Sequence, residues 1–258
     1  MKDIIHVKNT AYAKYEELLL RRDNVRKEAF IWERQYVRIF GEKILKLFEL
    51  KIRCIQKKKA IGYCQAVVNH GEKVDLKKLQ KYLDTEMKDY NMQLDAMIKD
   101  HESSKKATEI SEIEILEIKK IYRRLAKRLH PDINPKTNED ERLRDLWERI
   151  SIAYKCNNLA DIQELEVLAS AALERMEKAE IDIPDIDEKI TELGEEIDKI
   201  ISTDPYMFKY VIEDESAVKE KNEDLDEAYR SYEDYEKQLD ELIRTLTKQG
   251  VIFKWEMN

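Results

Sequence analysis

Glycine and proline are scarce in this chain, with only five Gly and four Pro in 258 residues. Both residue types interrupt helices, so their rarity favours long continuous elements. No stretch rich in Val, Ile and Thr alternates apolar and polar residues as a half-buried strand would. Lys, Glu, Leu and Ile are abundant instead, and we predict an all-α, elongated protein built from helical arms.

Cysteine and long apolar runs are also in short supply. The three cysteines, Cys54, Cys64 and Cys156, are scattered and form no CxxC pair. Neither a zinc site nor a disulfide framework is indicated, which fits a reducing compartment. No apolar run is long enough to span a membrane, and the N-terminus lacks the apolar region of a signal peptide. We therefore expect a cytoplasmic protein without a membrane segment.

Signatures of catalysis and of cofactor binding are missing as well. The sequence contains no phosphate-binding loop and no dinucleotide fingerprint. His6, His70 and His101 lie far apart in sequence on different predicted elements, so they do not form a metal-ligand pattern. We predict no metal, no cofactor and no catalytic residue, and we do not expect an enzyme.

Charge is what the sequence has in excess, at 40% of all residues. Residues 1–100 carry 22 Lys and Arg against 15 Asp and Glu, whereas residues 177–258 carry 11 against 25. The asymmetry suggests that N-terminal and C-terminal helices pair with each other, although it can instead mark separate external partners.

The N-terminal segment, residues 1–104, is predicted to be an arm of long helices. The first runs from about Ala11 to Ile61, with a stutter or bend near Gly41. Its apolar stripe advances by steps of three and four residues, with one step of seven between Leu18 and Val25. The next helix is predicted to begin after a cap at Asp75, and its apolar face is Leu76, Leu79, Leu83, Met87, Tyr90, Leu94 and Met97.

The C-terminal segment, residues 183–258, is predicted to be an acidic arm of two helices separated at Asp204-Pro205. Heptad spacing indicates coiled-coil seams, which can be satisfied within one chain or between copies, so homo-oligomerisation stays open. An apolar tail, Val251–Trp255, is expected to dock on the body. The two seams are Ile183, Ile186, Ile190, Leu193, Ile197 and Ile200, and then Leu225, Ala228, Tyr232, Tyr235, Leu239, Leu242 and Leu246.

The middle segment, residues 108–176, contains a strongly basic helix that begins near Thr108 or Ser111. Six of the ten residues from Lys119 to Arg128 are cationic and none is acidic. Like charges one turn apart repel, so we expect a negatively charged partner for this face. A solvated face without a partner is the common alternative, and nucleic acid is disfavoured because the whole chain is acidic. The basic face consists of Lys119, Lys120, Arg123, Arg124, Lys127 and Arg128.

The basic helix runs into a His-Pro-Asp turn, residues 130–132. Pro131 disfavours helical geometry at His130 and ends the helix there, which places Asp132 at the tip of a predicted hairpin. A second amphipathic helix follows a polar loop, and a break at Cys156-Asn157-Asn158 separates it from a third. The predicted core of the hairpin is Ile118, Ile121, Tyr122, Leu125, Leu129, Trp147, Ile150, Ala153 and Tyr154.

The basic helix, the His-Pro-Asp turn and the Trp147–Tyr154 stretch together resemble the J domain of the DnaJ-family co-chaperones, over about residues 108–170. In that family two antiparallel helices carry His-Pro-Asp in their connecting loop. The resemblance implies that His130, Pro131, Asp132 and the basic face engage a DnaK-type chaperone, whose own ATPase is stimulated. Neither a Gly/Phe-rich segment nor a cysteine-rich zinc domain follows, which is typical of the divergent class that keeps only the J domain.

Two departures from the family pattern are visible. The usual first helix of a J domain is not recognisable in Ser103–Glu114, and the loop from Pro131 to Asp140 looks longer than usual. We expect the neighbouring long helices to replace the missing packing.

The expected function is a J-domain co-chaperone whose helical arms hold an unidentified client protein. Two alternatives stay open. One is a coiled-coil scaffold in which the J-like hairpin is structural and stimulates no ATPase. The weaker one is nucleic-acid binding through the basic arm, residues 1–100.

Overall fold

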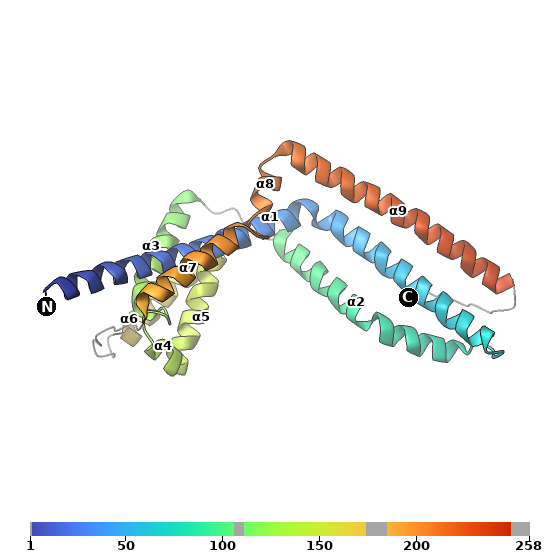
Figure 1. The fold of residues 1–258 in the computed structure, drawn as a ribbon, viewed down its shortest axis with the longest axis horizontal. Helices are drawn as coiled ribbons and strands as arrows, with labels where there is room; N and C mark the ends of the chain where they lie inside the picture. The colour runs from blue at the N-terminus through green and yellow to red at the C-terminus, as the bar shows by residue number, and fades with distance from the viewer. Residues whose placement is uncertain (1, 106–110, 174–184, 249–258) are drawn as a thin grey trace. The chain divides into compact units, whose positions relative to one another are not determined.

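The computed structural model describes residues 2–105, 111–173 and 185–248, and every regular element within those ranges is an α-helix (Figure 1). The predicted all-α class is therefore confirmed. No helix in these ranges has both the length and the apolar character needed to cross a bilayer. The elements are α1 (Lys2–Asn69), α2 (Leu76–Lys105), α3 (Glu112–Leu129), α4 (Lys136–Glu139), α5 (Glu141–Lys155), α6 (Leu159–Leu173), α7 (Ile186–Ile201), α8 (Phe208–Ile212) and α9 (Glu215–Lys248).

Most helix boundaries lie close to the predicted ones. Asp75 caps α2 as expected, because its carboxylate accepts hydrogen bonds from the backbone N–H groups of Lys77 (2.9 Å) and Lys78 (3.3 Å). Helix α1 extends beyond the predicted ends at both sides, and the short helices α4 and α8 were not predicted. Ile183 and the apolar tail Val251–Trp255 fall outside the described residues.

The chain divides into two compact units, each built from stretches that are far apart in sequence. Unit 1 comprises residues 1–33 and 108–209, and unit 2 comprises residues 34–107 and 210–258. Helix α1 contributes its N-terminal half to unit 1 and its C-terminal half to unit 2. The predicted segments 1–104 and 183–258 therefore each supply residues to both units.

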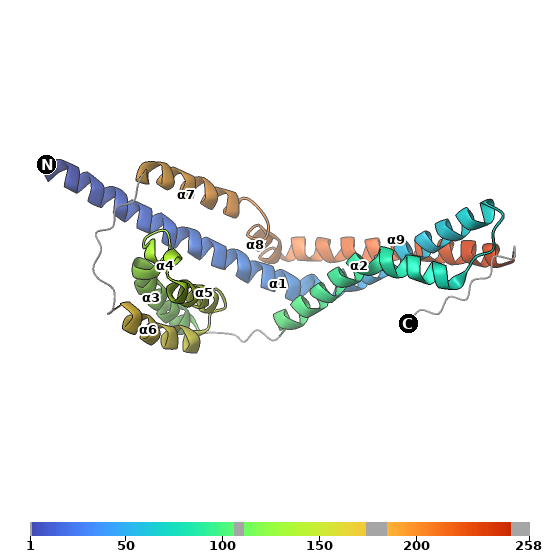
Figure 2. The same cartoon turned by 90° about the horizontal axis from the view of Figure 1, so that it is seen from below.

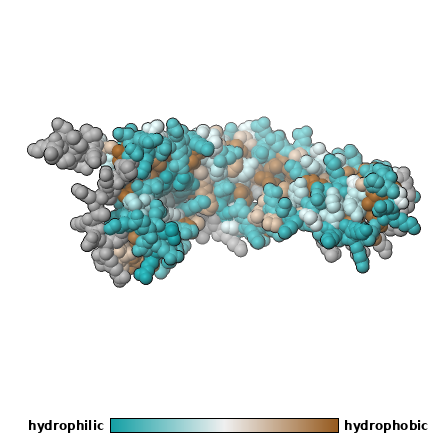
Figure 3. All heavy atoms as spheres, turned by 60° about the horizontal axis from the view of Figure 1, so that its bottom comes forward, coloured by the Kyte–Doolittle hydropathy of each residue, from teal (hydrophilic) through white to brown (hydrophobic). Residues whose placement is uncertain are grey.

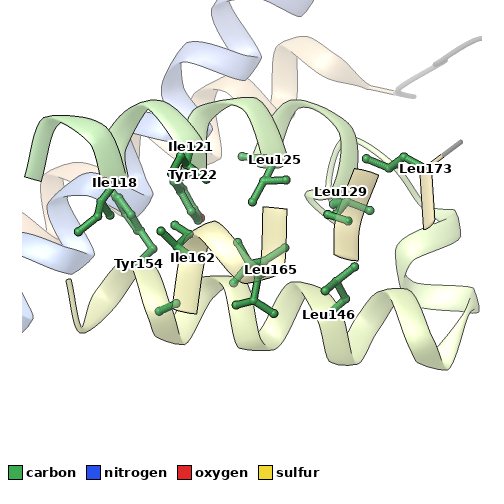
Figure 4. Close-up of a cluster of buried hydrophobic side chains, with 14 of the residues drawn as sticks. Ile118, Ile121, Tyr122, Leu125, Leu129, Leu146, Tyr154, Ile162, Leu165 and Leu173 are labelled. Carbon is green, nitrogen blue, oxygen red and sulfur yellow. The ribbon is translucent and has the colours of Figure 1, made fainter. Parts of the chain in front are cut away.

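The core of unit 1 is the helical hairpin of α3 and α5, with α6 packed against both helices (Figure 4). All nine predicted core residues of the hairpin lie in this cluster, Trp147 as a partly buried member. Helix α6 adds Ile162, Leu165, Ala169 and Leu173. Leu168 was predicted on the buried face of α6 and is 44% exposed, because Ala169 takes the inward position.

Unit 2 consists of the C-terminal half of α1 with α2 and α9 alongside it (Figures 1 and 2). Leu79 and Leu83 of α2 pack against the small side chains of Ala60 and Cys64 in α1. Leu239 of α9 packs against Leu50, Cys54 and Ile61 of α1. Gly41 permits a close approach of α2, since a Cβ atom there would lie 3.0 Å from the His101 ring. The predicted seam of α9 is wrong at Leu242, which is 40% exposed.

Ion pairs join the basic and the acidic helices of unit 2, as the charge distribution suggested. Glu236 of α9 accepts hydrogen bonds from Arg53 and Lys57 of α1, each at 3.0 Å. Lys57 also pairs with Asp240 at 2.6 Å, and Lys43 pairs with Asp226 at 2.8 Å. The visible surface is largely hydrophilic, with apolar residues in patches among the charged ones (Figure 3).

We expect Glu236→Gln to destabilise the protein by about 1 kcal/mol at neutral pH, because Glu236 is the acceptor shared by two cations. Burial alone would raise the pKa of Glu236, but the hydrogen bonds from Arg53 and Lys57 lower it, so the ionised form is favoured. Urea unfolding followed by circular dichroism measures the change. The matched control is Asp234→Asn, which removes an exposed carboxylate whose ion pair is with Lys237 on the same helix. Equal losses in the two variants would contradict the prediction.

Candidate docking site

Helix α3 begins at a capping box, which fixes where the basic face starts. Ser111 Oγ accepts from the backbone N–H of Glu114 (3.3 Å), and the Glu114 carboxylate accepts from the N–H of Ser111 (3.0 Å). The Ser111 hydroxyl also donates to the Glu114 carboxylate at 2.7 Å, and this bond together with the one from the Ser111 N–H lowers the pKa of Glu114. The start predicted at Ser111 is confirmed, whereas Thr108 lies outside the described residues.

The His-Pro-Asp turn closes around the His130 backbone and ring. The N–H of His130 donates to the carbonyl of Ala126 (2.9 Å), and ψ of 126° then takes the chain out of the helix ahead of Pro131. The His130 carbonyl accepts from Ile133 (2.9 Å) and Asn134 (2.7 Å). The N–H of Asp132 donates to His130 Nδ1 at 3.1 Å.

The imidazole of His130 is buried between two helices, and the residue is only 5% exposed. On one side its ring meets Trp147 of α5 edge-on, with the centroids 4.9 Å apart. On the other side Nε2 lies 3.6 Å from the carboxylate of Asp23 and 3.1 Å from the guanidinium of Arg22, both on α1. Helix α1 therefore covers the ring of His130, a residue that was predicted to contact a partner protein.

A buried ion pair in α1 organises this contact. Arg22 reaches the carboxylates of Asp23 (3.2 Å) and Asp132 (3.3 Å), and the Tyr122 hydroxyl donates to Asp23 at 2.7 Å. Burial alone would raise the pKa of Asp23, but the hydrogen bond from His130, the adjacent Arg22 charge and the Tyr122 hydroxyl outweigh it and lower the pKa. Asp132 itself keeps a side chain that is 42% exposed.

The residue after the turn anchors the loop in the core of unit 1. Ile133 is 1% exposed and packs with Tyr15 and Leu19 of α1 and with Leu193 of α7. The loop that looked long in sequence thus contains both this anchor and the short helix α4. Asp132 is held between Arg22 and Ile133, which restricts its position.

All six residues of the basic face are exposed. Two of them have an acidic partner: Arg124 pairs with Glu166 of α6 (2.7 Å), and Lys127 pairs with Glu16 of α1 (2.8 Å). Among the described residues no ion pair involves the other four, Lys119, Lys120, Arg123 and Arg128.

Sequence reasoning missed Arg22 and Asp23, although a signal was present. The apolar stripe of α1 takes its only seven-residue step between Leu18 and Val25, and Arg22 occupies the skipped position. The stripe continues on the buried side of the helix, so Arg22 is placed where an apolar residue is expected and is 9% exposed. A cation at such a position indicates a buried acidic partner, here Asp23 and Asp132.

Comparisons with protein-family models, with curated proteins and with solved structures give no match to this chain. No cluster of three or more His, Cys, Asp or Glu side chains suited to a metal ion occurs within residues 2–105, 111–173 and 185–248. Fold and site therefore define an all-α protein with a helical hairpin whose His-Pro-Asp turn is packed against α1.

We expect Tyr122→Phe to destabilise the protein by about 1.5–3 kcal/mol, because it removes a 2.7 Å hydrogen bond to a buried carboxylate. The matched control is Tyr154→Phe. Its hydroxyl reaches only the neutral amide of Asn24 at 3.4 Å, so the loss should be about 0.5 kcal/mol or less. Thermal and urea unfolding of both variants measures the difference, and a larger loss in Tyr154→Phe would refute this account of the network.

The lowered pKa of Asp23 predicts how stability depends on pH. An aspartate whose folded pKa lies below its ordinary value of 3.8 stabilises the fold above that value and loses the contribution as pH falls through the folded pKa. Asp23→Asn cannot titrate, so its melting temperature should fall less steeply than that of the wild type below about pH 4. Parallel curves for the two proteins would show that Asp23 is not a source of acid sensitivity.

Proposed function

We propose that the α3–α5 hairpin is a docking module for the ATPase of a DnaK-type chaperone, with His130, Pro131, Asp132 and the basic face as its contact surface. The observation that carries the proposal is the position of Asp132. Its carboxylate is partly exposed beside the end of a helix whose basic face is exposed, and four of the six cations of that face form no ion pair within the described part of the chain. This arrangement supports binding to an acidic protein surface that also presents an arginine.

The physical role of each part follows from its exposure. Exposed cations raise the rate of encounter with a negative surface and fix orientation, and both effects weaken with salt. Asp132 can then accept a charge-assisted hydrogen bond from the partner. A docked hairpin that binds one state of the ATPase more tightly shifts the population toward that state. The partner hydrolyses ATP, and the helical arms are proposed to hold a client in a cytoplasmic setting through coiled-coil packing.

Helix α1 competes with such a partner. Arg22 already forms an ion pair with the Asp132 carboxylate at 3.3 Å, and an arginine of the partner would compete with it for this carboxylate. A partly exposed ion pair contributes up to about 1 kcal/mol, which corresponds to about a fivefold loss of apparent affinity. Stimulation by the wild-type protein should therefore be weaker than the hairpin alone would allow.

The burial of His130 favours a second candidate function. A ring that is 5% exposed and enclosed by Trp147, Arg22 and Asp23 can serve the stability of unit 1 without meeting any partner. In this alternative the protein is a helical scaffold, and the His-Pro-Asp turn holds the hairpin on α1.

Single-turnover ATP hydrolysis by the DnaK-type chaperone of the same organism distinguishes the two candidates. We expect the full-length protein to accelerate hydrolysis, and Asp132→Asn and His130→Gln to abolish the acceleration. Arg22→Lys keeps a cation beside the buried Asp23 but shortens the reach to Asp132, so it should lower the concentration needed by up to about fivefold. Asp132 is partly exposed, so we expect Asp132→Asn to leave the fold intact. A loss of stimulation in this variant can then be attributed to docking. His70→Gln, an exposed histidine in unit 2, is the matched control and should behave as wild type.

The outcomes are distinct. Absence of stimulation by both the wild type and Arg22→Lys would leave the scaffold as the function. Equal stimulation by the wild type and Asp132→Asn would show that Asp132 is not a contact and would overturn the proposed docking surface. Stimulation that appears only in Arg22→Lys would show a docking module kept closed by α1.

A further inference from the structure

A cavity of about 680 Å³ opens in unit 1 beside the His-Pro-Asp turn, between α1, α5 and the end of α7. Its volume lies within the range of small-molecule sites. Four aromatic side chains line it and give it an apolar wall: Phe30 of α1, Tyr122 of α3, and Trp147 and Tyr154 of α5. Tyr122 and Tyr154 are stacked with centroids 3.8 Å apart, so part of this wall is rigid.

Lys27 lines the cavity and is an unusual lysine. It is 3% exposed, and its Nζ atom has no hydrogen-bond partner among the residues that the structure describes. The ammonium group lies 3.9 Å from the centroid of the Tyr154 ring, a cation–π contact that offsets only part of the cost of burying a charge. Burial, and secondarily the charge of Lys119, lower the pKa of Lys27 to about 8, so most of it is still cationic near neutral pH. The three N–H groups of the Lys27 ammonium therefore donate to no acceptor within the described residues.

A second lysine faces the same cavity from α5. Lys155 lies 4.2 Å from the centroid of the Phe30 ring, and no ion pair within the described residues involves it. The two arginines of the cavity differ, because Arg22 pairs with Asp23 and Asp132 and Arg26 pairs with Glu196. The cavity therefore keeps two lysines without acidic partners, one on each of two helices, above an aromatic wall.

Buried cations in proteins are normally paired, and an unpaired one calls for a missing counter-charge. The two acids of the cavity that are not already engaged, Glu33 and Asp204, are exposed and form no ion pair with either lysine within the described residues. We propose that the cavity binds a small organic anion, with its phosphate or carboxylate between Lys27 and Lys155 and a planar body against the aromatic wall. The proposal does not rest on docking to an ATPase, although His130, Pro131 and Asp132 also line the cavity.

The experiment titrates the full-length protein with phenyl phosphate, benzoate and inorganic phosphate by isothermal calorimetry. We expect saturable binding of one or both aromatic anions, and the stronger of the two identifies the preferred anionic group. Inorganic phosphate lacks the planar body and should bind about tenfold more weakly or not at all. Equal binding of inorganic phosphate and phenyl phosphate would overturn the proposal, since it would indicate an adventitious ion only. Absence of binding by every probe would overturn it as well.

Lys27→Met locates the site and controls for folding at the same time. It should weaken binding of the aromatic anion by about tenfold or more, because a charged hydrogen-bond donor is lost. The same change should raise the melting temperature, because an apolar side chain replaces a buried unpaired charge and contacts the Tyr154 ring. Lys155→Met should also weaken binding. Lys14→Met, at an exposed lysine of α1 outside the cavity, is the matched control and should change neither property.

A merely structural lysine gives the opposite pattern. If Lys27→Met lowers the melting temperature and leaves the affinity for the aromatic anions unchanged, Lys27 holds the fold and the proposed site is wrong.

Discussion

Unit 1 depends on one buried cation. Arg22 lies in the apolar stripe of α1 and is tolerated there because Asp23 and Asp132 supply opposite charge within 3.3 Å. Asp23 in turn is satisfied by Tyr122 from α3 and lies next to the ring of His130. Removing one member of a buried pair leaves an uncompensated charge, so these contacts act together. They attach the hairpin to α1 and set the position of the His-Pro-Asp turn.

The hairpin is packed by other elements from two directions. Helix α6 covers both α3 and α5, and Leu20 of α1 packs against the edge of the same cluster. Ile133 adds a second attachment between the loop, α1 and α7. A hairpin held in this way has little freedom to move as a whole, and the proposed docking surface is consequently presented on a rigid base. The same attachment reduces access to His130, which is why activation and scaffolding are both physically reasonable roles.

The cations of α1 in unit 2 and those on the basic face of α3 differ in how many of them form ion pairs. In unit 2 the lysines and arginines of α1 meet acidic residues of α9, as Lys57 does with Glu236 and Asp240. On α3, by contrast, most of the basic face has no acidic neighbour within the described residues. Charge that is neutralised internally stabilises packing, whereas charge that stays exposed on a rigid helix is available to another molecule. This contrast supports a binding role for α3 more than for the basic half of α1.

The sequence alone determined the helical class, the cap at Asp75 and the hairpin core, and it narrowed the start of the basic helix to Thr108 or Ser111. These follow from local rules: periodic apolar spacing, capping side chains and the exclusion of helix before Pro131. It also placed Asp132 at a hairpin tip. It did not determine which face of α6 is inward at Leu168, since a short apolar helix offers several equivalent faces. Only the tertiary structure brought α1 onto the turn. The contacts of Arg22 with Asp132 and of Asp23 with Tyr122 join residues about a hundred positions apart, and no local pattern encodes which distant acid a buried cation will meet.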